Sequence, residues 1–271
     1  MRFYTYALIL LTMFLSLFWG SPALAATNLP LTYDQIKGTG LANKCPEILG
    51  ASRGRGIIPL APGQTVSFSD MCLEPTAFFI REEATKKRKE PELVPGKLVT
   101  RATSSLDFVK GTLVANPDGS ITLTEKEGLD YQPITIQMPG GERVAILFTI
   151  KGYKATTQAG LGGITPSTDF EGETDVPTYR GANFIDPKGR GLAIGYDAAE
   201  ALTAKRDDFA KNNKDDRTSK GKMSLQVAKV NSETGEIAGT FECEQLSGTD
   251  LGAIKPEEVV IRGVFYAKVN I

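Results

Sequence analysis

Residues 259–269 read VVIRGVFYAKV and carry the clearest strand signal in the chain. One face of an extended segment would hold Val259, Ile261, Gly263, Phe265, Ala267 and Val269, and the other would hold Val260, Arg262, Val264, Tyr266 and Lys268. Side chains of a β-strand alternate between two faces, so this period of two predicts a strand with one face in the core. The end of the chain is therefore expected to form one wall of an all-β fold.

Similar patterns recur upstream, separated by turn sequences. Residues 106–114 and 121–124 flank Asn-Pro-Asp-Gly at 116–119, a strong hairpin signal, and residues 143–151 alternate in the same way. A second turn, at residues 231–235, precedes another strand pattern. Repeated antiparallel hairpins with one apolar face predict a barrel, because closure removes exposed edges, and a sandwich is the alternative.

Two long polar segments interrupt this pattern, at about residues 152–191 and 196–221. The first is rich in Gly, Pro and charged residues, and such segments usually form displayed loops that carry function. We interpret both as insertions that build a head on a single β domain of residues 26–271.

The first 25 residues have the three parts of a secretory signal peptide. Arg2 is followed by an apolar run at residues 7–19 and by small residues that end at Ala25. The run is shorter than the roughly 20 residues that span a bilayer. We expect residues 1–25 to be cleaved and the mature chain to work on the far side of a membrane without spanning it.

Composition excludes several classes of function. The chain has 31 Lys and Arg, 32 Asp and Glu, and no histidine. This balance gives no reason to expect a nucleic-acid partner. The missing histidine excludes a zinc hydrolase or a Ser-His-Asp enzyme. Carboxylate-only and Ser-Lys catalysis remain, but no motif supports either, and we expect no catalytic residue and no enzyme activity.

The three cysteines suit an exported protein. A disulfide between Cys45 and Cys72 is favoured, because both lie in the Gly- and Pro-rich N-terminal region. Closing that loop would stabilise the fold by roughly 3 to 4 kcal/mol in the chain-entropy model. Cys243 shares a predicted strand face with Ile237 and Phe241, so we interpret it as a small buried apolar group.

Four acidic residues alternate in one segment: Asp169, Glu171, Glu173 and Asp175. In an extended chain they would lie on one side. Three interpretations stay open, namely a solvated acidic loop, a surface that accepts protons or attracts cations, and a calcium site. The segment lacks a calcium-hand motif, so we assign no metal ligand to it.

Charged residues of both signs follow, among glycines that permit tight turns. Arg180, Asp186, Lys188 and Arg190 would be displayed in a defined shape, because Pro187 stiffens the loop. Arginine can bind a carboxylate through two parallel hydrogen bonds. Pairing within the loop and docking to a partner both remain open.

Several of these motifs stand in the order seen in the manganese-stabilising extrinsic proteins of photosystem II, which the chain resembles. They are TYDQIKGTGLANKCP at residues 32–46, GYKA at 152–155, PTYRG at 177–181, DPKGRG at 186–191, GYD at 195–197 and TDLGA at 249–253. The resemblance spans essentially the whole chain after the leader. The single leader is typical of a cyanobacterial protein, since a plastid protein would carry an added transit peptide.

The resemblance implies an eight-stranded antiparallel β-barrel with a large loop-built head and an N-terminal segment tied by the Cys45–Cys72 disulfide. It implies a peripheral subunit on the lumenal side of the thylakoid membrane, docked over the oxygen-evolving manganese-calcium cluster. Such a subunit stabilises the cluster and its chloride requirement without ligating manganese, and helps protons to leave. It would hold no cofactor of its own and bind calcium only weakly.

The resemblance also implies partners, namely the reaction-centre and inner-antenna subunits of photosystem II and other extrinsic subunits. The implied attachment residues are Tyr33, Asp34 and Lys37 in the N-terminal segment and Tyr179, Arg180, Asp186, Lys188 and Arg190 in the head. The acidic residues 169–175 would face solvent. Cys243 departs from the family's usual two cysteines, and the missing histidine removes any His-assisted cation site.

Two other functions compete with this interpretation. An exported small-molecule carrier is the main alternative, because β-barrels often enclose ligands. A carrier needs an open apolar lumen, whereas we expect Phe108, Phe148, Phe241 and Phe265 to fill a small barrel. An exported hydrolase would need two catalytic carboxylates, and no such pair can be nominated.

Overall fold

Strands dominate the computed structural model, which describes residues 43–48, 56–84, 90–100, 103–176, 219–248 and 255–271. All of these residues belong to one unit of contacting residues, Ile36–Ile271. The strands are β1 (Ile58–Pro59), β2 (Thr65–Glu82), β3 (Glu92–Leu98), β4 (Leu106–Ala115), β5 (Ile121–Leu129), β6 (Tyr131–Gln137), β7 (Arg143–Thr149), β8 (Lys154–Thr156), β9 (Gly163–Ile164), β10 (Asp169–Val176), β11 (Ser219–Asn231), β12 (Glu236–Leu246) and β13 (Glu258–Val269).

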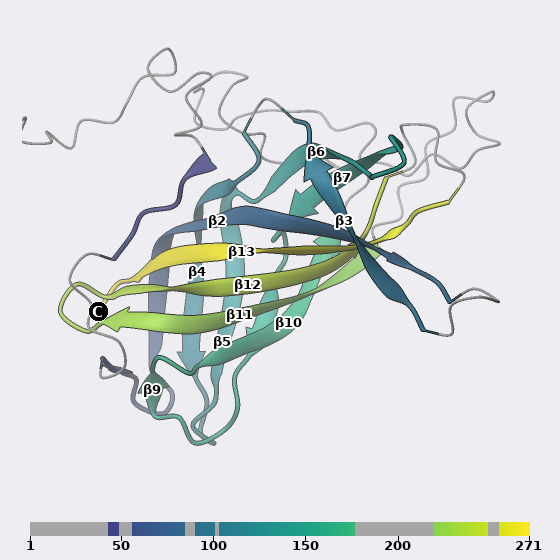
Figure 1. Ribbon diagram of the computed structural model, residues 1–271. Coiled ribbons are helices and arrows are strands. Elements are labelled where there is room, and N and C mark those ends of the chain that lie inside the picture. The colour runs from purple at the N-terminus through teal and green to yellow at the C-terminus, as the bar shows by residue number, and fades with distance from the viewer. Residues whose placement is uncertain (1–42, 49–55, 85–89, 101–102, 177–218, 249–254) are drawn as a thin grey trace, which may run out of the picture. The chain divides into compact units, whose positions relative to one another are not determined.

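Eight of these strands close into an antiparallel barrel (Figure 1). The order around the wall is β2, β4, β5, β8, β10, β11, β12 and β13, and β13 pairs with β2 to complete the circle. The predicted eight-stranded barrel is confirmed, and the sandwich alternative is wrong. Closure pairs both edges of every wall strand, which removes the exposed edges that an open sheet presents.

The two predicted hairpins are confirmed. β4 and β5 pair up to Ala115 and Ile121, and the turn between them is closed by the Gly119 N–H, which donates to the Asn116 carbonyl at 3.0 Å. β11 and β12 are joined in the same way through Gly235, at a φ of 75°. The alternation of β13 is also confirmed, because all six residues of its predicted inner face are buried.

Aromatic side chains fill the barrel interior. Phe68, Phe170, Phe241 and Phe265 are all buried in one continuous apolar cluster. The Phe241 ring lies over Gly263 on the neighbouring strand, and a Cβ atom at Gly263 would come within 2.6 Å of that ring. The described part of the barrel therefore offers no open lumen, which disfavours the carrier alternative.

Phe108 does not point inward as predicted. β4 carries one extra residue relative to β5, because Asp107 pairs with Leu129 and Lys110 pairs with Glu127. This β-bulge places Phe108 at a φ of 52° and leaves it 37% exposed, while Val109 takes the inward position. Strict alternation fails here because a bulge moves every later side chain to the opposite face.

β6 and β7 form a hairpin outside the barrel wall, joined to it through β3 (Figure 1). β7 is buried on both faces, whereas the sequence predicted one buried face. Phe148 of β7 stacks on Phe241 with ring centroids 5.6 Å apart, so the hairpin packs on the barrel core. The Gln245 side chain donates to the Leu147 carbonyl at 2.6 Å, which ties β7 to the end of β12.

The boundaries of the two predicted insertions need correction. Residues 154–156 and 169–176, placed in the first insertion, are the barrel strands β8 and β10. The second insertion was predicted to end at Gly221, but β11 begins at Ser219. β10 escaped detection because its inward positions include Gly172 and Thr174, which do not form an apolar pattern. Residues 177–218 lie outside the described residues.

The cysteine predictions are confirmed. Cys45 and Cys72 form a disulfide, with Cα atoms 5.6 Å apart. Cys243 is a free thiol that is fully buried in the core. Burial raises the pKa of this thiol to about 12, so it stays protonated and unreactive in the folded barrel.

Candidate functional site

The four alternating carboxylates, which we call the acidic row, lie on the outer side of β10. Glu171 and Glu173 are exposed, and Asp169 and Asp175 are half-buried. Phe170 and Val176 occupy the inward positions between and beyond them and are buried. The acidic row therefore shares one face, as its spacing predicted, but it belongs to a barrel strand and not to a loop.

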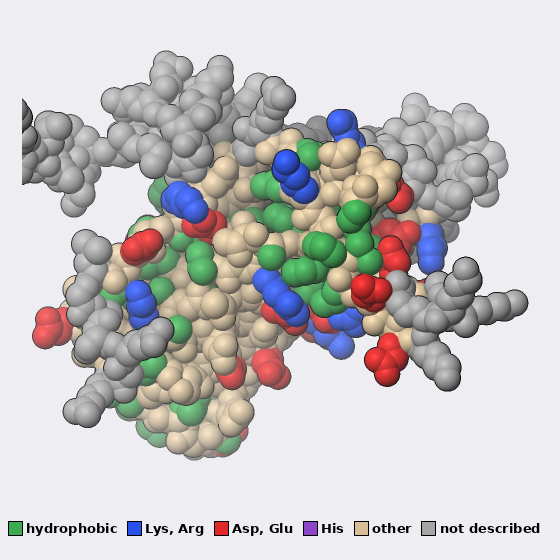
Figure 2. Space-filling model, in the orientation of Figure 1, with side chains coloured by type: hydrophobic (Ala, Val, Ile, Leu, Met, Phe, Trp, Pro, Cys, Tyr) green, Lys and Arg blue, Asp and Glu red, His purple; other side chains and the backbone are tan. Residues whose placement is uncertain are grey.

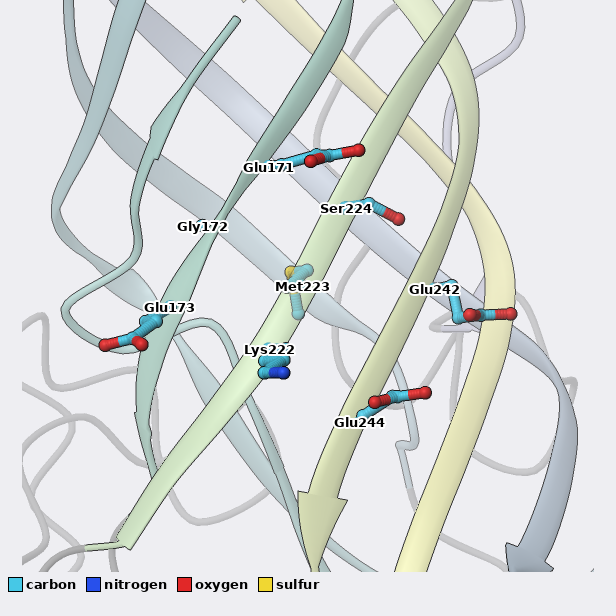
Figure 3. A pocket seen from close by; sticks show the side chains of 8 residues that line it. All are labelled: Glu171, Gly172, Glu173, Lys222, Met223, Ser224, Glu242 and Glu244. Carbon is cyan, nitrogen blue, oxygen red and sulfur yellow. The ribbon is translucent and has the colours of Figure 1, made fainter. Parts of the chain in front are cut away.

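A shallow groove of about 390 Å³ runs beside the acidic row (Figure 3). It is lined by Glu171, Gly172, Glu173, Lys222, Met223, Ser224, Glu242 and Glu244, from β10, β11 and β12. The register places Lys222 directly opposite both Glu173 and Glu244. One ammonium thus lies between two carboxylates across three strands, which lowers the repulsion that adjacent carboxylates would feel.

Ion pairs also join basic and acidic side chains elsewhere on the outer face of the barrel. Arg262 contacts Glu242 at 2.5 Å, Arg81 contacts Glu244 at 2.5 Å, and Lys220 contacts Asp175. Figure 2 shows the resulting mixture of basic and acidic side chains on this side of the molecule. These partners are two-fifths or more exposed in most cases, so water screens each pair and its contribution to stability is small.

The acidic row does not gather into a metal centre. Within the described ranges, no group of three or more His, Cys, Asp or Glu residues is arranged to hold a metal ion. Alternate residues of a strand are roughly 7 Å apart, and the intervening partners on β11 include lysines. The surface can attract cations or exchange protons, but it does not present the clustered oxygen ligands of a tight calcium site.

Glu125 and Asp130 form a second acidic site, which is buried and was not predicted from the sequence. Glu125 of β5 is only 7% exposed, and Asp130, which follows that strand, is 4% exposed. Lys151 approaches Asp130 at 3.3 Å, and the Gly152 N–H donates to Glu125 Oε2 at 2.8 Å. Oε1 of Glu125 has no hydrogen-bond partner among the described residues.

These surroundings raise the pKa of Glu125 to about 7. The largest cause is burial, which disfavours the charged carboxylate, and the negative charge of Asp130 adds to it. The Gly152 N–H and the Lys151 ammonium oppose the rise but do not cancel it. Glu125 therefore exchanges a proton near neutral pH, where ordinary carboxylates stay ionised.

One sequence signal pointed to Glu125. It follows Ile121 and Leu123 at the same period of two, so a carboxylate occupies an apolar face of β5. No local signal pointed to Lys151 or Gly152, because they approach the two carboxylates from the turn before β8, which pairs with β5 only in the folded sheet. Glu125 is thus recognisable in the sequence as a charged residue on an apolar strand face, whereas Lys151 and Gly152 interrupt no such pattern.

The buried carboxylates and the acidic row meet at one end of the barrel wall. Gly152 lies between them, because it donates to Glu125 and a Cβ atom on it would come within 2.6 Å of Asp175. The Asp175 N–H also donates to the Lys151 carbonyl at 2.8 Å. Val176, the next residue, pairs with Ser219 of β11.

The predicted attachment residues lie outside the described residues. This holds for Tyr33, Asp34 and Lys37 and for Tyr179, Arg180, Asp186, Lys188 and Arg190. Their assignment to partner contacts stays a prediction. In the part of the chain that is described, no helix has the length and apolar character needed to cross a membrane.

The chain is similar in sequence to known proteins over most of its length. The profile of the family "Manganese-stabilising protein / photosystem II polypeptide" matches residues 29–269. The chain is 55% identical to Photosystem II extrinsic protein O of Thermosynechococcus vestitus over 252 residues, which cover 92% of each chain. It is 57% identical to the protein of the same name from Nostoc over 243 residues, 89% of this chain and 88% of the relative. It is 45% identical to Oxygen-evolving enhancer protein 1, chloroplastic, of Volvox carteri, over 89% of this chain and 79% of that protein.

Proposed function

This chain belongs to the manganese-stabilising protein / photosystem II polypeptide family, and from that membership we propose that it is an extrinsic subunit of photosystem II. It stabilises the oxygen-evolving manganese-calcium cluster by docking over it on the lumenal side of the thylakoid membrane. It supplies no ligand to manganese and catalyses no reaction itself. The observation that carries the proposal is the family match over residues 29–269, together with relatives more than half identical over about nine-tenths of the chain.

Docking would use the two charged segments singled out in the sequence. Arg180, Lys188 and Arg190 would pair with carboxylates of the reaction-centre and inner-antenna subunits, and Tyr33, Asp34 and Lys37 would form a second attachment. Complementary charges orient a partner and speed its association more than they add affinity. The filled barrel supports this role, because a rigid body loses little conformational freedom when it binds.

Proton exit would begin at the buried carboxylates. Glu125, whose pKa is about 7, accepts a proton released nearby, and the acidic row beyond Gly152 passes it to the lumen. A buried carboxylate with an ordinary pKa would stay ionised at neutral pH and would rarely hold a proton inside the wall, whereas Glu125 can both take up a proton and release it. The contact of Gly152 with Glu125 and its closeness to Asp175 support this order of transfer.

Calcium would bind the acidic row only weakly. Lys222 lies opposite Glu173, and Lys220 already pairs with Asp175. A calcium ion would have to displace these ammonium groups and would find few additional oxygen ligands there. We therefore propose no metal of its own for the barrel and assign the chloride and manganese effects to docking.

The test is oxygen evolution by photosystem II membranes from which the extrinsic proteins have been removed. At low chloride, added protein should restore the rate severalfold and slow the loss of manganese, measured by atomic absorption. An equal amount of an unrelated acidic protein controls for non-specific protection. If neither oxygen evolution nor manganese retention exceeds that of the control, the proposal is wrong.

A further inference from the structure

A short segment before the barrel, residues 43–48, is fastened to the outer face of β2, and we call it the strap. Two β2 residues hold it, Cys72 through the disulfide to Cys45 and Glu74 through hydrogen bonds. Both face outward, because Glu74 lies directly opposite Val264, an exposed residue of β13. The strap therefore lies on the outer face of β2.

Glu74 uses both carboxylate oxygens on the strap. Oε1 accepts a hydrogen bond from the Lys44 ammonium, and Oε2 accepts one from the Cys45 N–H at 3.1 Å. Asn43 adds a further tie, because its Oδ1 accepts from the Ser104 N–H at 2.6 Å. These three contacts come from the consecutive residues Asn43, Lys44 and Cys45, and none of them is made by a disulfide sulfur.

Burial makes the Glu74 contacts significant. Glu74 is 8% exposed, so its carboxylate has little access to water and depends on the strap for compensation. The hydrogen bond and charge of Glu74 raise the pKa of Lys44, as expected for an ammonium held beside a carboxylate. Charge-assisted hydrogen bonds of this kind are about twice as strong as neutral ones.

We propose that Glu74 is a positioning residue that holds the strap on the barrel independently of the disulfide and thereby limits where the N-terminal attachment segment can reach. The second part rests on the proposed function, in which Tyr33, Asp34 and Lys37 contact photosystem II. Lys37 precedes Lys44 by seven residues, and a chain of that length spans at most roughly 25 Å. Holding Lys44 at Glu74 sets the direction of the chain just before Cys45, which the disulfide alone leaves free, and so limits the volume that Lys37 can reach.

Trypsin tests the first part, because the Lys44–Cys45 bond is a tryptic site that the strap contacts protect. In the oxidised protein, Glu74→Gln should accelerate cleavage after Lys44 at least tenfold and speed exchange of the Cys45 amide to a similar degree. The control is Glu127→Gln, which removes an exposed carboxylate that pairs with Lys110 at 3.1 Å and should change neither rate. Lys44→Arg keeps the charge and should stay as protected as the wild type.

The same substitution is then made without the disulfide. In a Cys45→Ser, Cys72→Ser background the strap should remain protected, and adding Glu74→Gln should release it. Cys243 is the only thiol in that background, and because it is buried it reports folding by failing to react with a thiol reagent. If the background unfolds, the oxidised comparison decides the outcome. Equal cleavage rates for wild type and Glu74→Gln overturn the proposal.

Rebinding to depleted photosystem II membranes tests the second part. Glu74→Gln should lower the affinity roughly three- to tenfold at moderate salt, and Glu127→Gln should leave it unchanged. If the strap is released but affinity is unchanged, the positioning role is wrong. If the wild-type protein does not rebind at all, the proposed function fails, while the cleavage result still decides whether Glu74 holds the strap.

Discussion

Glu125 shows how one side chain can couple the fold to pH. Burial raises its pKa from 4.5 to about 7, so the folded protein holds a proton that the unfolded chain has lost above about pH 5. Because the folded state binds more protons in this window, stability falls as pH rises from about 4.5 to 7. Above pH 7 the folded protein carries the full cost of a buried carboxylate.

Glu125→Gln should remove this pH dependence, because the amide keeps the shape and the contact with the Gly152 N–H but cannot ionise. The wild type should lose roughly 3 kcal/mol of unfolding free energy between pH 4.5 and 7 through this group, and the variant should gain stability relative to it at pH 8. Urea unfolding at pH 5, 6, 7 and 8 measures the difference.

Glu127→Gln is the matched control for this experiment. Glu127 lies on the same strand but is exposed, and it pairs with Lys110 in solvent. Its removal should leave the slope of stability against pH between 5 and 8 unchanged. Parallel pH profiles for wild type and Glu125→Gln would show that Glu125 does not titrate near neutrality.

At the scale of elements, the barrel depends on large residues that face very small ones on the next strand. Phe241 of β12 lies over Gly263 of β13, and the backbone of β2 approaches Gly263 from the other side. Because the barrel interior is tightly packed, the Phe241 ring fits only if the facing residue on the next strand has no side chain, as Gly263 does. Pairing a large residue with glycine therefore lets β2, β12 and β13 lie close together around Gly263.

Gly263→Ala should therefore destabilise the barrel strongly. Its Cβ atom would lie 2.6 Å from the Phe241 ring and collide with the Glu74 carbonyl, and neither can move without shifting a strand. We expect a loss of about 3 kcal/mol or more, measured by urea unfolding followed by fluorescence.

Gly140→Ala provides the comparison for that measurement. Gly140 lies in the turn between β6 and β7, and an added Cβ would meet no atom within 4 Å. The substitution should change stability by less than about 0.5 kcal/mol. A similar small change for Gly263→Ala would mean that β12 and β13 adjust more freely than their contacts indicate.

At the scale of the whole molecule, the proposed docking assigns separate tasks to the barrel and to the charged residues predicted to attach it. The core keeps the wall rigid, while the predicted attachment residues lie outside the described residues. A charge change in such a segment should alter binding without altering stability. The two properties can therefore be tested independently in one variant.

Arg180→Glu should weaken rebinding to depleted photosystem II membranes about tenfold or more at low ionic strength. Salt screens exposed charges, so the gap between wild type and variant should narrow as salt is added. Lys229→Glu, a change of equal charge at an exposed position of β11, should have little effect. Equal affinities for wild type and Arg180→Glu at every salt concentration would contradict docking through this residue, and urea unfolding should give the same stability for both.

Much of the protein could be predicted from local patterns. The alternation of β13, the turns at Gly119 and Gly235 and the burial of Cys243 depend on residues within one strand or one hairpin, and all were confirmed. The family motifs likewise lie in short runs of sequence. These features are local because a strand's two faces and a turn's backbone angles are set by adjacent residues.

Other features depended on contacts between distant parts of the chain. Long-range pairing closed the barrel, placed β10 in its wall and turned Phe108 outward at a bulge. It also brought Lys151 and Gly152 to the buried carboxylates, and the strap to Glu74. The alternation of residues along a strand predicts which side chains share a face, but it does not predict which other strand pairs with it. The raised pKa of Glu125 and the contacts of Glu74 with the strap therefore arise only in the folded barrel.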